Sequence, residues 1–265
     1  MANQLLFIFQ GNQLLVTNSE SSPALPNRSF VDSIQSIILR DHQVGFYDHV
    51  LCRAIEVSDD YIPKAGYRFT GLRTLFGVFD EQLISLIGRA LQIVEWDRSH
   101  QYCSKCGNEN TRHEHELAKV CPSCSYRSYP RISPVVMGLI VRDNEILLAR
   151  SPHFAPGMYS AIAGFCEVGE SLEMALHREI KEEVNVAVDN IQYYTSQSWP
   201  FPHSLMVAFT CRYVSGIIIP QPEEIEDAKW FNVDALPLLP HPVSVARKLI
   251  DYTVTNIKAR YHALH

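Results

Sequence analysis

Acidic residues are concentrated in one short segment of the chain. Glu179, Glu182 and Glu183 stand at positions i, i+3 and i+4, so a helix would place them on one face, about 5–6 Å apart. Like charges this close repel one another, and the cost rises as water is excluded. A cation is therefore expected among them, and carboxylate oxygens suit Mg²⁺ or Mn²⁺. The plain alternative is a solvated acidic face with Arg178 and Lys181 as neighbours.

Four of the seven cysteines form two close pairs. Two residues separate Cys103 from Cys106 and Cys121 from Cys124, and residues 107–120 lie between the pairs. Two such pairs supply four thiolates to one tetrahedral metal, which favours zinc or iron. Because a full set of protein ligands leaves no position for a reacting water, we predict a structural site. A nucleic-acid-binding ribbon is the alternative.

Aromatic residues alternate with proline in a third segment, residues 196–206. Phe201 lies between Pro200 and Pro202, directly after Trp199, and prolines cannot continue a central strand. The segment predicts a stiff, partly apolar loop that could receive a flat ring. The alternative is a tight loop whose two large rings only fill a core.

Length and composition limit the class of protein. A chain of 265 residues that is 46% hydrophobic can bury one large core or two smaller ones, and two domains are the better expectation. A net charge of -6 argues against coating nucleic acid through the overall field. No apolar run approaches the roughly 18–20 residues that span a bilayer, and the N-terminus lacks the features of a signal peptide. We therefore expect no membrane contact and a reducing, cytoplasmic location.

Hydrophobic periodicity predicts the elements that position these residues. Strands on either side of helices indicate a mixed α/β layer structure. The first predicted helix has Asp80 as its N-cap and ends near Trp96. Further helices are predicted over 171–184 and 243–261, the latter with Pro242 at its start. Strands are predicted over 5–9 and 13–17, joined as a hairpin by residues 10–12, over 135–141 and 145–149, joined as a second hairpin by residues 142–144, and over 191–198 and 205–214.

The acidic segment fits the pattern G-x5-E-x7-R-E-U-x-E-E-x-G-U, where U is aliphatic. It runs from Gly164 through Glu170 and Arg178 to Val186 and resembles the signature of the Nudix hydrolase family. One position departs, because Asn185 stands where the pattern has its last glycine. Asparagine tolerates positive φ better than most residues, so we expect Asn185 to adopt the left-handed conformation that caps the helix.

The Nudix resemblance implies an α/β/α sandwich that hydrolyses a nucleoside diphosphate linked to another moiety. It implies that Arg178 pairs with Glu170 to brace the loop before the helix, so that Glu170 positions rather than acts as the base. It also implies two or more Mg²⁺ or Mn²⁺ ions. Their expected ligands are the side chains of Glu179, Glu182 and Glu183, to which the resemblance to one branch of the family adds Glu224 and the main-chain carbonyl of Ala163.

The aromatic loop resembles the S-Q-P-W-P-F-P-x-S signature of the NADH pyrophosphatase branch of the Nudix family, with Ser198 in place of a proline. That branch also carries a four-cysteine zinc ribbon and an extra N-terminal domain, so the resemblance spans most of the chain. It implies a homodimer with one structural zinc per chain. The expected parts are an N-terminal α+β domain over 1–97, the zinc ribbon over 98–130 and the Nudix domain over 131–265.

The same resemblance implies NAD(H) as substrate, with AMP and nicotinamide mononucleotide as products, and extends to the NAD cap of RNA 5′ ends. Phe165 and Tyr129, the tyrosine from the partner subunit, are expected to sandwich the adenine. The other residues expected to contact substrate are Arg73, Glu116, Gln197, Ser198, Trp199, Pro200, Phe201, Pro202, His203, Ser204 and Ala246.

Two other functions stay open. One is a Nudix hydrolase of ADP-ribose or nucleotide sugars, which the aromatic loop makes less favoured. The other is a non-catalytic zinc-ribbon adaptor that binds RNA or a protein, against which the intact set of carboxylates speaks.

Overall fold

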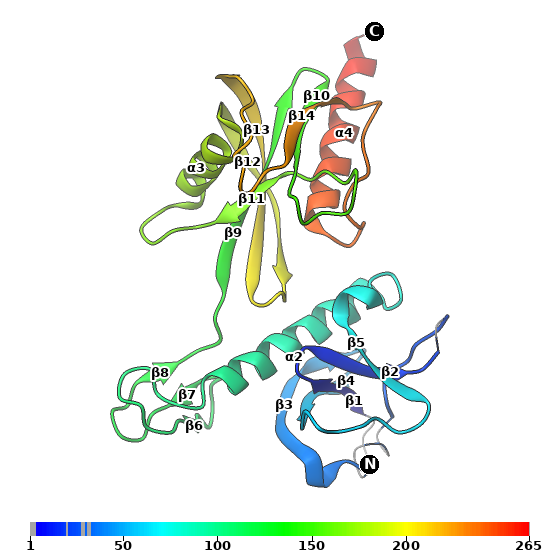
Figure 1. Cartoon of the computed structure of the whole chain (residues 1–265), viewed down its shortest axis with the longest axis vertical. Helices are drawn as coiled ribbons and strands as arrows, with labels where there is room; N and C mark the ends of the chain where they lie inside the picture. Colours follow the sequence, from blue (N-terminus) through cyan, green and yellow to red (C-terminus); the bar gives the residue numbers. More distant parts are fainter. Residues whose placement is uncertain (1–3, 20, 28–29, 31–32, 265) are drawn as a thin grey trace. The chain divides into compact units, whose positions relative to one another are not determined.

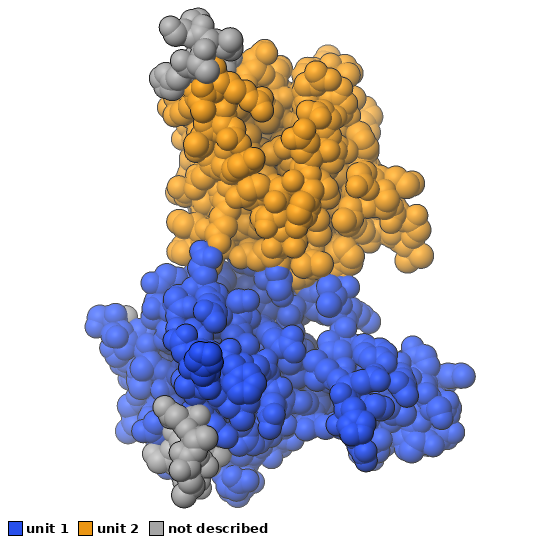
Figure 2. Space-filling view, turned by 180° about the vertical axis from the view of Figure 1, so that it is seen from behind, with its two compact units in different colours: residues 1–132, 198–203 blue, residues 133–197, 204–265 orange. Residues whose placement is uncertain are grey.

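The computed structural model describes residues 4–19, 21–27, 30 and 33–264. The chain divides into two compact units, which Figure 2 colours separately. Unit 1 comprises Met1–Ile132 and Ser198–His203, and unit 2 comprises Ser133–Gln197 and Ser204–His265. No helix among the described residues is both long enough and apolar enough to cross a membrane.

Unit 1 contains a five-stranded sheet in the order β3-β4-β1-β2-β5. The first predicted hairpin is confirmed, because β1 (Gln4–Gln10) and β2 (Gln13–Thr17) pair antiparallel with Phe9 opposite Leu14. The remaining strands of this sheet are absent from the sequence prediction, because polar residues interrupt their apolar runs, whereas the runs of β1 and β2 are unbroken. Unit 1 also contains β3 (Ile38–Tyr47), β4 (Val50–Val57), β5 (Tyr67–Gly71), and the short 3₁₀ helices η1 (Gln35–Ile37) and η2 (Leu72–Leu75).

Helix α2 (Glu81–Ser99) packs on one face of this sheet (Figure 1). The predicted cap is confirmed, since the Asp80 carboxylate accepts a hydrogen bond from the backbone N–H of Leu83 at 2.9 Å. The helix continues past the predicted end near Trp96 to Ser99, and its residue Asp97 is buried among cations that lie far away in the sequence.

The ribbon of unit 1 is a three-stranded sheet of very short strands, β6 (Thr111–Arg112), β7 (Lys119–Val120) and β8 (Arg127–Ser128). Strands of this length bury little apolar surface, so hydrophobic packing alone gives such a module little stability. A structural metal stabilises small modules of this kind.

Unit 2 contains the second predicted hairpin, both predicted helices and both later strands. Its last helix starts after Ser244, whose Oγ accepts a hydrogen bond from the backbone N–H of Arg247 at 3.3 Å, so the predicted start at Pro242 is wrong. The elements are β9 (Ser133–Arg142), β10 (Glu145–Arg150), β11 (Ile162–Phe165), α3 (Leu172–Val184), β12 (Val186–Trp199), β13 (Ser204–Gly216), β14 (Asp227–Asn232) and α4 (Val245–Leu264).

The sheet of unit 2 has the order β12-β13-β9-β10-β14, with β11 paired to β9. Helices α3 and α4 lie on opposite faces of it (Figure 1). The central strand β9 serves both faces. Its Val136 and Ile140 join the core under α3, whereas Met137 and Leu139 join the core under α4. The predicted α/β/α sandwich is therefore confirmed.

Candidate functional site

Helix α3 is fixed at both ends by local contacts. At its start, Ser171 Oγ accepts a hydrogen bond from the backbone N–H of Met174 at 3.2 Å. At its end, Asn185 has φ 57° and ψ 30°, and its N–H donates to the carbonyl of Lys181 at 3.0 Å. The predicted left-handed cap at Asn185 is thus confirmed. These two ends define the helical segment that carries the glutamates.

Two of the three glutamates are buried despite their charge. Glu179 and Glu183 are 8% and 6% exposed, whereas Glu182 is exposed. Gly164 on β11 lies directly against Glu179, because a Cβ at this position would come 1.9 Å from the carboxyl carbon. The glycine of the sequence pattern therefore leaves the space that the Glu179 carboxylate fills.

Arg178 braces the loop before α3. Its Nε and Nη2 donate to the two carboxylate oxygens of Glu170 at 2.6 and 2.8 Å, and Nη2 also donates to the carbonyl of Phe165 at 2.9 Å. Its Nη1 reaches Glu179 at 2.8 Å and Glu182 at 3.1 Å. The hydrogen bond from Arg178 lowers the pKa of Glu170 to about 2. The predicted pairing is present, and Glu170 is engaged in it with both oxygens.

Glu183 lacks a counter-charge within the described part of the chain. Among the residues that the structure describes, none gives its carboxylate a hydrogen bond or an ion pair. Burial, followed by the charges of Glu179, the exposed Glu224 and Glu182, raises the pKa of Glu183 to about 8. Burial also raises the pKa of Glu179. A buried carboxylate is ionised at neutral pH only beside positive charge, so this set of oxygen donors fits a hard divalent cation.

The cysteine sulfurs lie closer together than these carboxylates. Cys103 Sγ is 3.6 Å from Cys124 Sγ, and Cys106 Sγ is 3.4 Å from Cys121 Sγ. Within the described ranges, they form the one group of three or more potential ligands whose atoms all lie within 4.8 Å of one another. Hydrogen bonds from Asn108 lower the pKa of Cys106 to about 6, which favours the metal-binding thiolate. Four converging sulfurs fit one structural zinc.

The aromatic loop, residues 198–203, belongs to unit 1. The Trp199 ring lies 5.7 Å from Phe76 and 5.2 Å from Phe201, centroid to centroid. The Arg73 guanidinium stands 4.3 Å above the Phe201 ring, a favourable cation–π distance. Phe201 also packs against the core of unit 1. The structure thus brings Arg73 to this loop, and its rings contribute partly to core packing.

Two contacts seat this loop on α2. Ser198 Oγ donates to Gln92 Oε1 at 3.3 Å. Pro200 is buried against Gly88, where a Cβ would come 2.8 Å from the proline ring. The following Phe201–Pro202 peptide bond is cis. Ser198, which replaces the proline of the signature, is therefore held by a hydrogen bond to the helix.

The two aromatic residues predicted to hold adenine are both exposed and lie in different units. Tyr129 of unit 1 is 53% exposed, and its hydroxyl donates to the Glu116 carboxylate at 2.8 Å. This hydrogen bond, aided by the charge of Arg127, lowers the pKa of Glu116. Phe165 of unit 2 is 57% exposed at the end of β11, two residues after Ala163. Both rings are accessible to a planar ligand.

Three other predicted substrate residues contribute to packing within unit 2. The Gln197 amide donates to the carbonyl of Val243 and accepts from the N–H of Val245, both at 2.8 Å. It therefore fixes the start of α4. Ser204 and Ala246 are each 6% exposed. Their contact with substrate stays a prediction.

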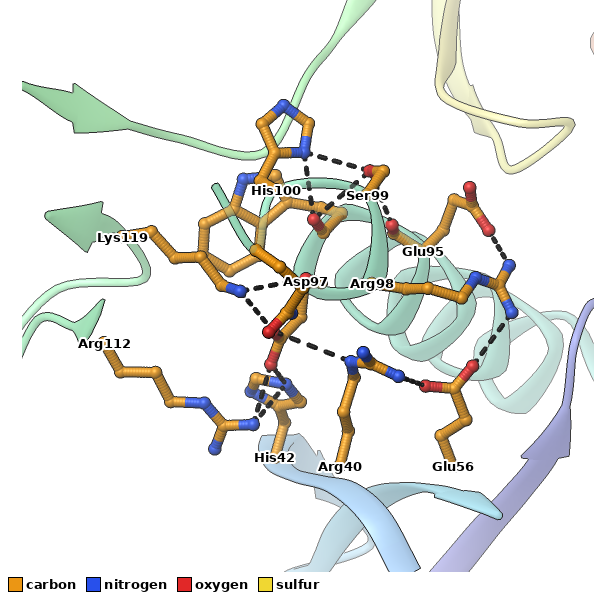
Figure 3. A network of polar contacts seen from close by, with 12 residues as sticks. Arg40, His42, Glu56, Glu95, Asp97, Arg98, Ser99, His100, Arg112 and Lys119 are labelled. Carbon is orange, nitrogen blue, oxygen red and sulfur yellow. Dashed lines mark hydrogen bonds and ion pairs between the residues drawn. The ribbon is translucent and has the colours of Figure 1, made fainter. Parts of the chain in front are cut away.

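A buried ionic network in unit 1 was not predicted from the sequence (Figure 3). Its centre, Asp97, is 3% exposed and lies 2.6 Å from His42 Nε2, 2.7 Å from Lys119 Nζ and 2.7 Å from Arg112 Nη2. Burial alone would raise the pKa of Asp97, but these hydrogen bonds and charges hold it well below its usual range. The network ties the ribbon to α2 and β3. Its members lie far apart in the sequence at no regular spacing, so no local sequence pattern could have predicted the network.

Three family models match successive parts of the chain. A NADH pyrophosphatase-like rudimentary NUDIX domain matches residues 3–96, a NADH pyrophosphatase zinc ribbon domain matches 98–129, and a NUDIX domain matches 132–252. The sandwich and the glutamate cluster of α3 both lie in the last of these ranges. The fold is therefore that of a Nudix hydrolase, and the candidate site lies within its NUDIX domain.

Curated proteins called NAD-capped RNA hydrolase NudC are similar over most of their length. The chain is 46% identical over 236 residues to one from Pseudomonas putida (strain W619), covering 89% of this chain and 85% of that protein. It is 47% identical over 216 residues to one from Pseudomonas aeruginosa (strain LESB58), covering 81% and 77%. A solved Nudix hydrolase from Nitrosomonas europaea matches with a TM-score of 0.49 and 24% identity, covering 61% and 93%. The chain belongs to the Nudix family, in its NADH pyrophosphatase branch.

Proposed function

We propose that this protein hydrolyses the pyrophosphate bond of NAD(H), giving AMP and nicotinamide mononucleotide, and removes the NAD cap from RNA 5′ ends. The observation that carries the proposal is Glu183, a carboxylate that is 6% exposed and lacks a counter-charge within the described chain. A cation at this place would meet the negative charge of a diphosphate. Relatives called NAD-capped RNA hydrolases support the choice of substrate.

The catalytic cations would be two or more Mg²⁺ or Mn²⁺ ions, held by Glu179, Glu182, Glu183, Glu224 and the main-chain carbonyl of Ala163. Such ions, when bound, neutralise the diphosphate and lower the pKa of water. The chain's own part is to keep these donors in place. It does so through the fixed ends of α3 and the glycine beside Glu179.

The substrate-contacting residues of this proposal keep their predicted roles. Arg178 and Glu170 position the loop before α3, and the exposed ring of Phe165, together with that of Tyr129 from the partner subunit, receives the adenine. Loop 198–203, together with Arg73, contacts the remainder of the dinucleotide. The division into parts over 1–97, 98–130 and 131–265 and the homodimer stay predictions from the family resemblance, and the cytoplasmic location stays a prediction from the sequence.

Product analysis tests this function directly. Purified protein is incubated with NADH and Mg²⁺ or Mn²⁺, and the products are separated by chromatography. AMP and reduced nicotinamide mononucleotide are expected, and NAD-capped RNA should yield RNA with a 5′-monophosphate. ADP-ribose is assayed in parallel, and a clear preference for it would favour the first alternative function.

Glu183→Gln tests the assignment of the site. Its kcat should fall by about 100-fold or more, because metal-assisted catalysis is worth several kcal/mol. Glu173→Gln, in the exposed first turn of the same helix, is the matched control and should keep its activity. Zinc content should be unchanged in both variants. Unaltered NADH turnover in Glu183→Gln would contradict the proposed site, and RNA binding without any hydrolysis by wild type would favour the adaptor.

A further inference from the structure

A cleft of about 360 Å³ lies in unit 1 beside loop 198–203. Its walls are the C-terminal part of α2, the residue after it, the chain beyond the ribbon, and the end of the loop. Pro202 and His203 of the loop line it together with His100 and Arg131. The last two residues have no role in the function proposed above.

Arg131 gives this cleft a positive charge. The side chain is exposed, and no described residue forms a hydrogen bond or an ion pair with it. The acidic residue of the lining, Glu95, is already paired with Arg98. An anion that enters the cleft therefore meets a free guanidinium, a group well suited to phosphate.

His100 adds a hydrogen-bonding group beside this charge. Its Nδ1 lies 2.9 Å from the carbonyl oxygen of Trp96 and 2.9 Å from Ser99 Oγ. Because a carbonyl oxygen only accepts, Nδ1 carries the hydrogen, and Nε2 of the neutral ring is an acceptor. Figure 3 shows the His100 ring standing away from α2 with this nitrogen outermost. An acceptor of this kind suits a ribose hydroxyl.

We propose that the cleft binds the ribose and phosphate that follow the NAD moiety in NAD-capped RNA. This inference rests on the proposed function and names a site for the RNA part of that substrate. In such an RNA the chain continues from the 3′-oxygen of the adenosine. Arg131 follows Tyr129 by two residues, so the partner subunit, which is expected to supply Tyr129 to the adenine, also brings its Arg131 and its cleft next to the adenosine. The first phosphate beyond the adenosine therefore meets the guanidinium.

The lining also indicates that the cleft does not recognise the identity of a base. Trp96 is 4% exposed, so its indole cannot stack against a base. Contacts to phosphate and sugar position a nucleic acid without recognising its sequence. We therefore expect little dependence on the identity of the nucleotide after the cap.

Charge reversal at Arg131 tests the cleft. For Arg131→Glu, kcat/KM on a NAD-capped oligoribonucleotide should fall about tenfold, and its dependence on salt should become shallower. Turnover of NADH, which lacks the extra phosphate, should change less than about two-fold. Lys105→Glu makes the same change at an exposed ribbon lysine outside the cleft and should affect neither substrate.

The outcomes separate this inference from the proposed function. An equal loss on both substrates, or no loss on either, would overturn the cleft assignment. A wild-type protein that hydrolyses NADH but not the capped oligonucleotide would also overturn it while leaving NADH hydrolysis intact. A wild-type protein inactive on both would contradict the proposed function itself.

Discussion

The two units each bury a carboxylate, and they surround it in opposite ways. Asp97 in unit 1 is 3% exposed and contacts Lys119, Arg112 and His42, which hold its pKa well below its usual range. Glu183 in unit 2 is 6% exposed and faces other carboxylates, and its pKa rises to about 8. Burial raises the pKa in both places, so the neighbouring charges make the difference.

This contrast separates a structural carboxylate from a functional one. The chain itself neutralises Asp97, so its charge helps to join the ribbon to α2. The described residues leave Glu183 without a counter-charge, and the charge of Glu179 lies beside it. A strongly perturbed carboxylate without a partner is a candidate for binding a cation or substrate. Burial alone would not have distinguished the two.

The largest effect on stability is expected for Asp97→Asn. The substitution keeps the shape but leaves Lys119, which is 3% exposed, without its counter-ion. We expect the free energy of unfolding to fall by about 3–5 kcal/mol at pH 7, as when a buried ion pair is broken. Because the folded pKa of Asp97 is lowered, its contribution is present above the unfolded pKa of about 3.9 and is lost as the pH falls further. Urea unfolding at several pH values measures both effects.

Asp189→Asn is the matched control for Asp97→Asn. Asp189 pairs with Arg212, but the two side chains are 44% and 67% exposed. Exposed pairs contribute about 0–1 kcal/mol, so this variant should unfold nearly as wild type does. Equal decreases in the free energy of unfolding for the two variants would show that the Asp97 network stabilises the fold no more than an exposed ion pair does.

Glu183→Gln, unlike Asp97→Asn, should raise the free energy of unfolding. The measurement uses protein freed of Mg²⁺ and Mn²⁺ but retaining zinc. The folded pKa of Glu183, about 8, is higher than its unfolded value, so its contribution is fully present below about pH 4 and is lost as the pH rises through 8. The variant avoids this loss. Its free energy of unfolding should exceed that of wild type by about 1–3 kcal/mol at pH 8 and match it near pH 4.

Glu182→Gln provides the comparison on the same helix. Its side chain is 52% exposed and pairs with Arg178, so the expected change is within about 0.5 kcal/mol. If Glu183→Gln gave no gain in stability between pH 5 and 8, Glu183 would not be an uncompensated buried charge.

Gly164→Ala should change the position of a single carboxylate in unit 2. The added methyl group would displace the Glu179 carboxylate, which lies 1.9 Å from the Cβ position. We expect kcat for NADH to fall about tenfold, equivalent to about 1.4 kcal/mol, with zinc content unchanged. Gly71→Ala in unit 1, where a Cβ meets no atom within 4 Å, should leave zinc content and the free energy of unfolding unchanged. A fully active Gly164→Ala would show that the position of Glu179 is not critical.

The smallest effects are expected at the end of α3. Asn185→Gly removes the cost of φ 57° but also loses side-chain contacts to Lys181 and to the carbonyl of Ile217. The free energy of unfolding should therefore change by less than about 0.5 kcal/mol. Asn185→Ala loses the contacts and keeps the strain, so a decrease of about 1 kcal/mol is expected. Thermal unfolding of wild type and the two variants measures these changes, and Asn185→Ala is expected to be the least stable of the three.

Features that depend on neighbours along the chain were predicted correctly from the sequence. The turn after β1, the cap at Asp80 and the left-handed Asn185 each involve residues within one turn of one another. Their energies are local, so their spacing is enough to define them. The pairing of Arg178 with Glu170 came from the family resemblance, and the structure contains it.

Tertiary structure decided which charges are buried and what surrounds them. The i, i+3 and i+4 spacing places Glu179, Glu182 and Glu183 on one side of a helix, but the packing of α3 on the sheet determines that only Glu182 is exposed. Likewise, no residue near Asp97 in the sequence predicts its ion pair with Lys119. Water is removed and distant charges are brought together only when the sheet and the ribbon close over them. These steps, rather than residue spacing, therefore set the pKa of each carboxylate.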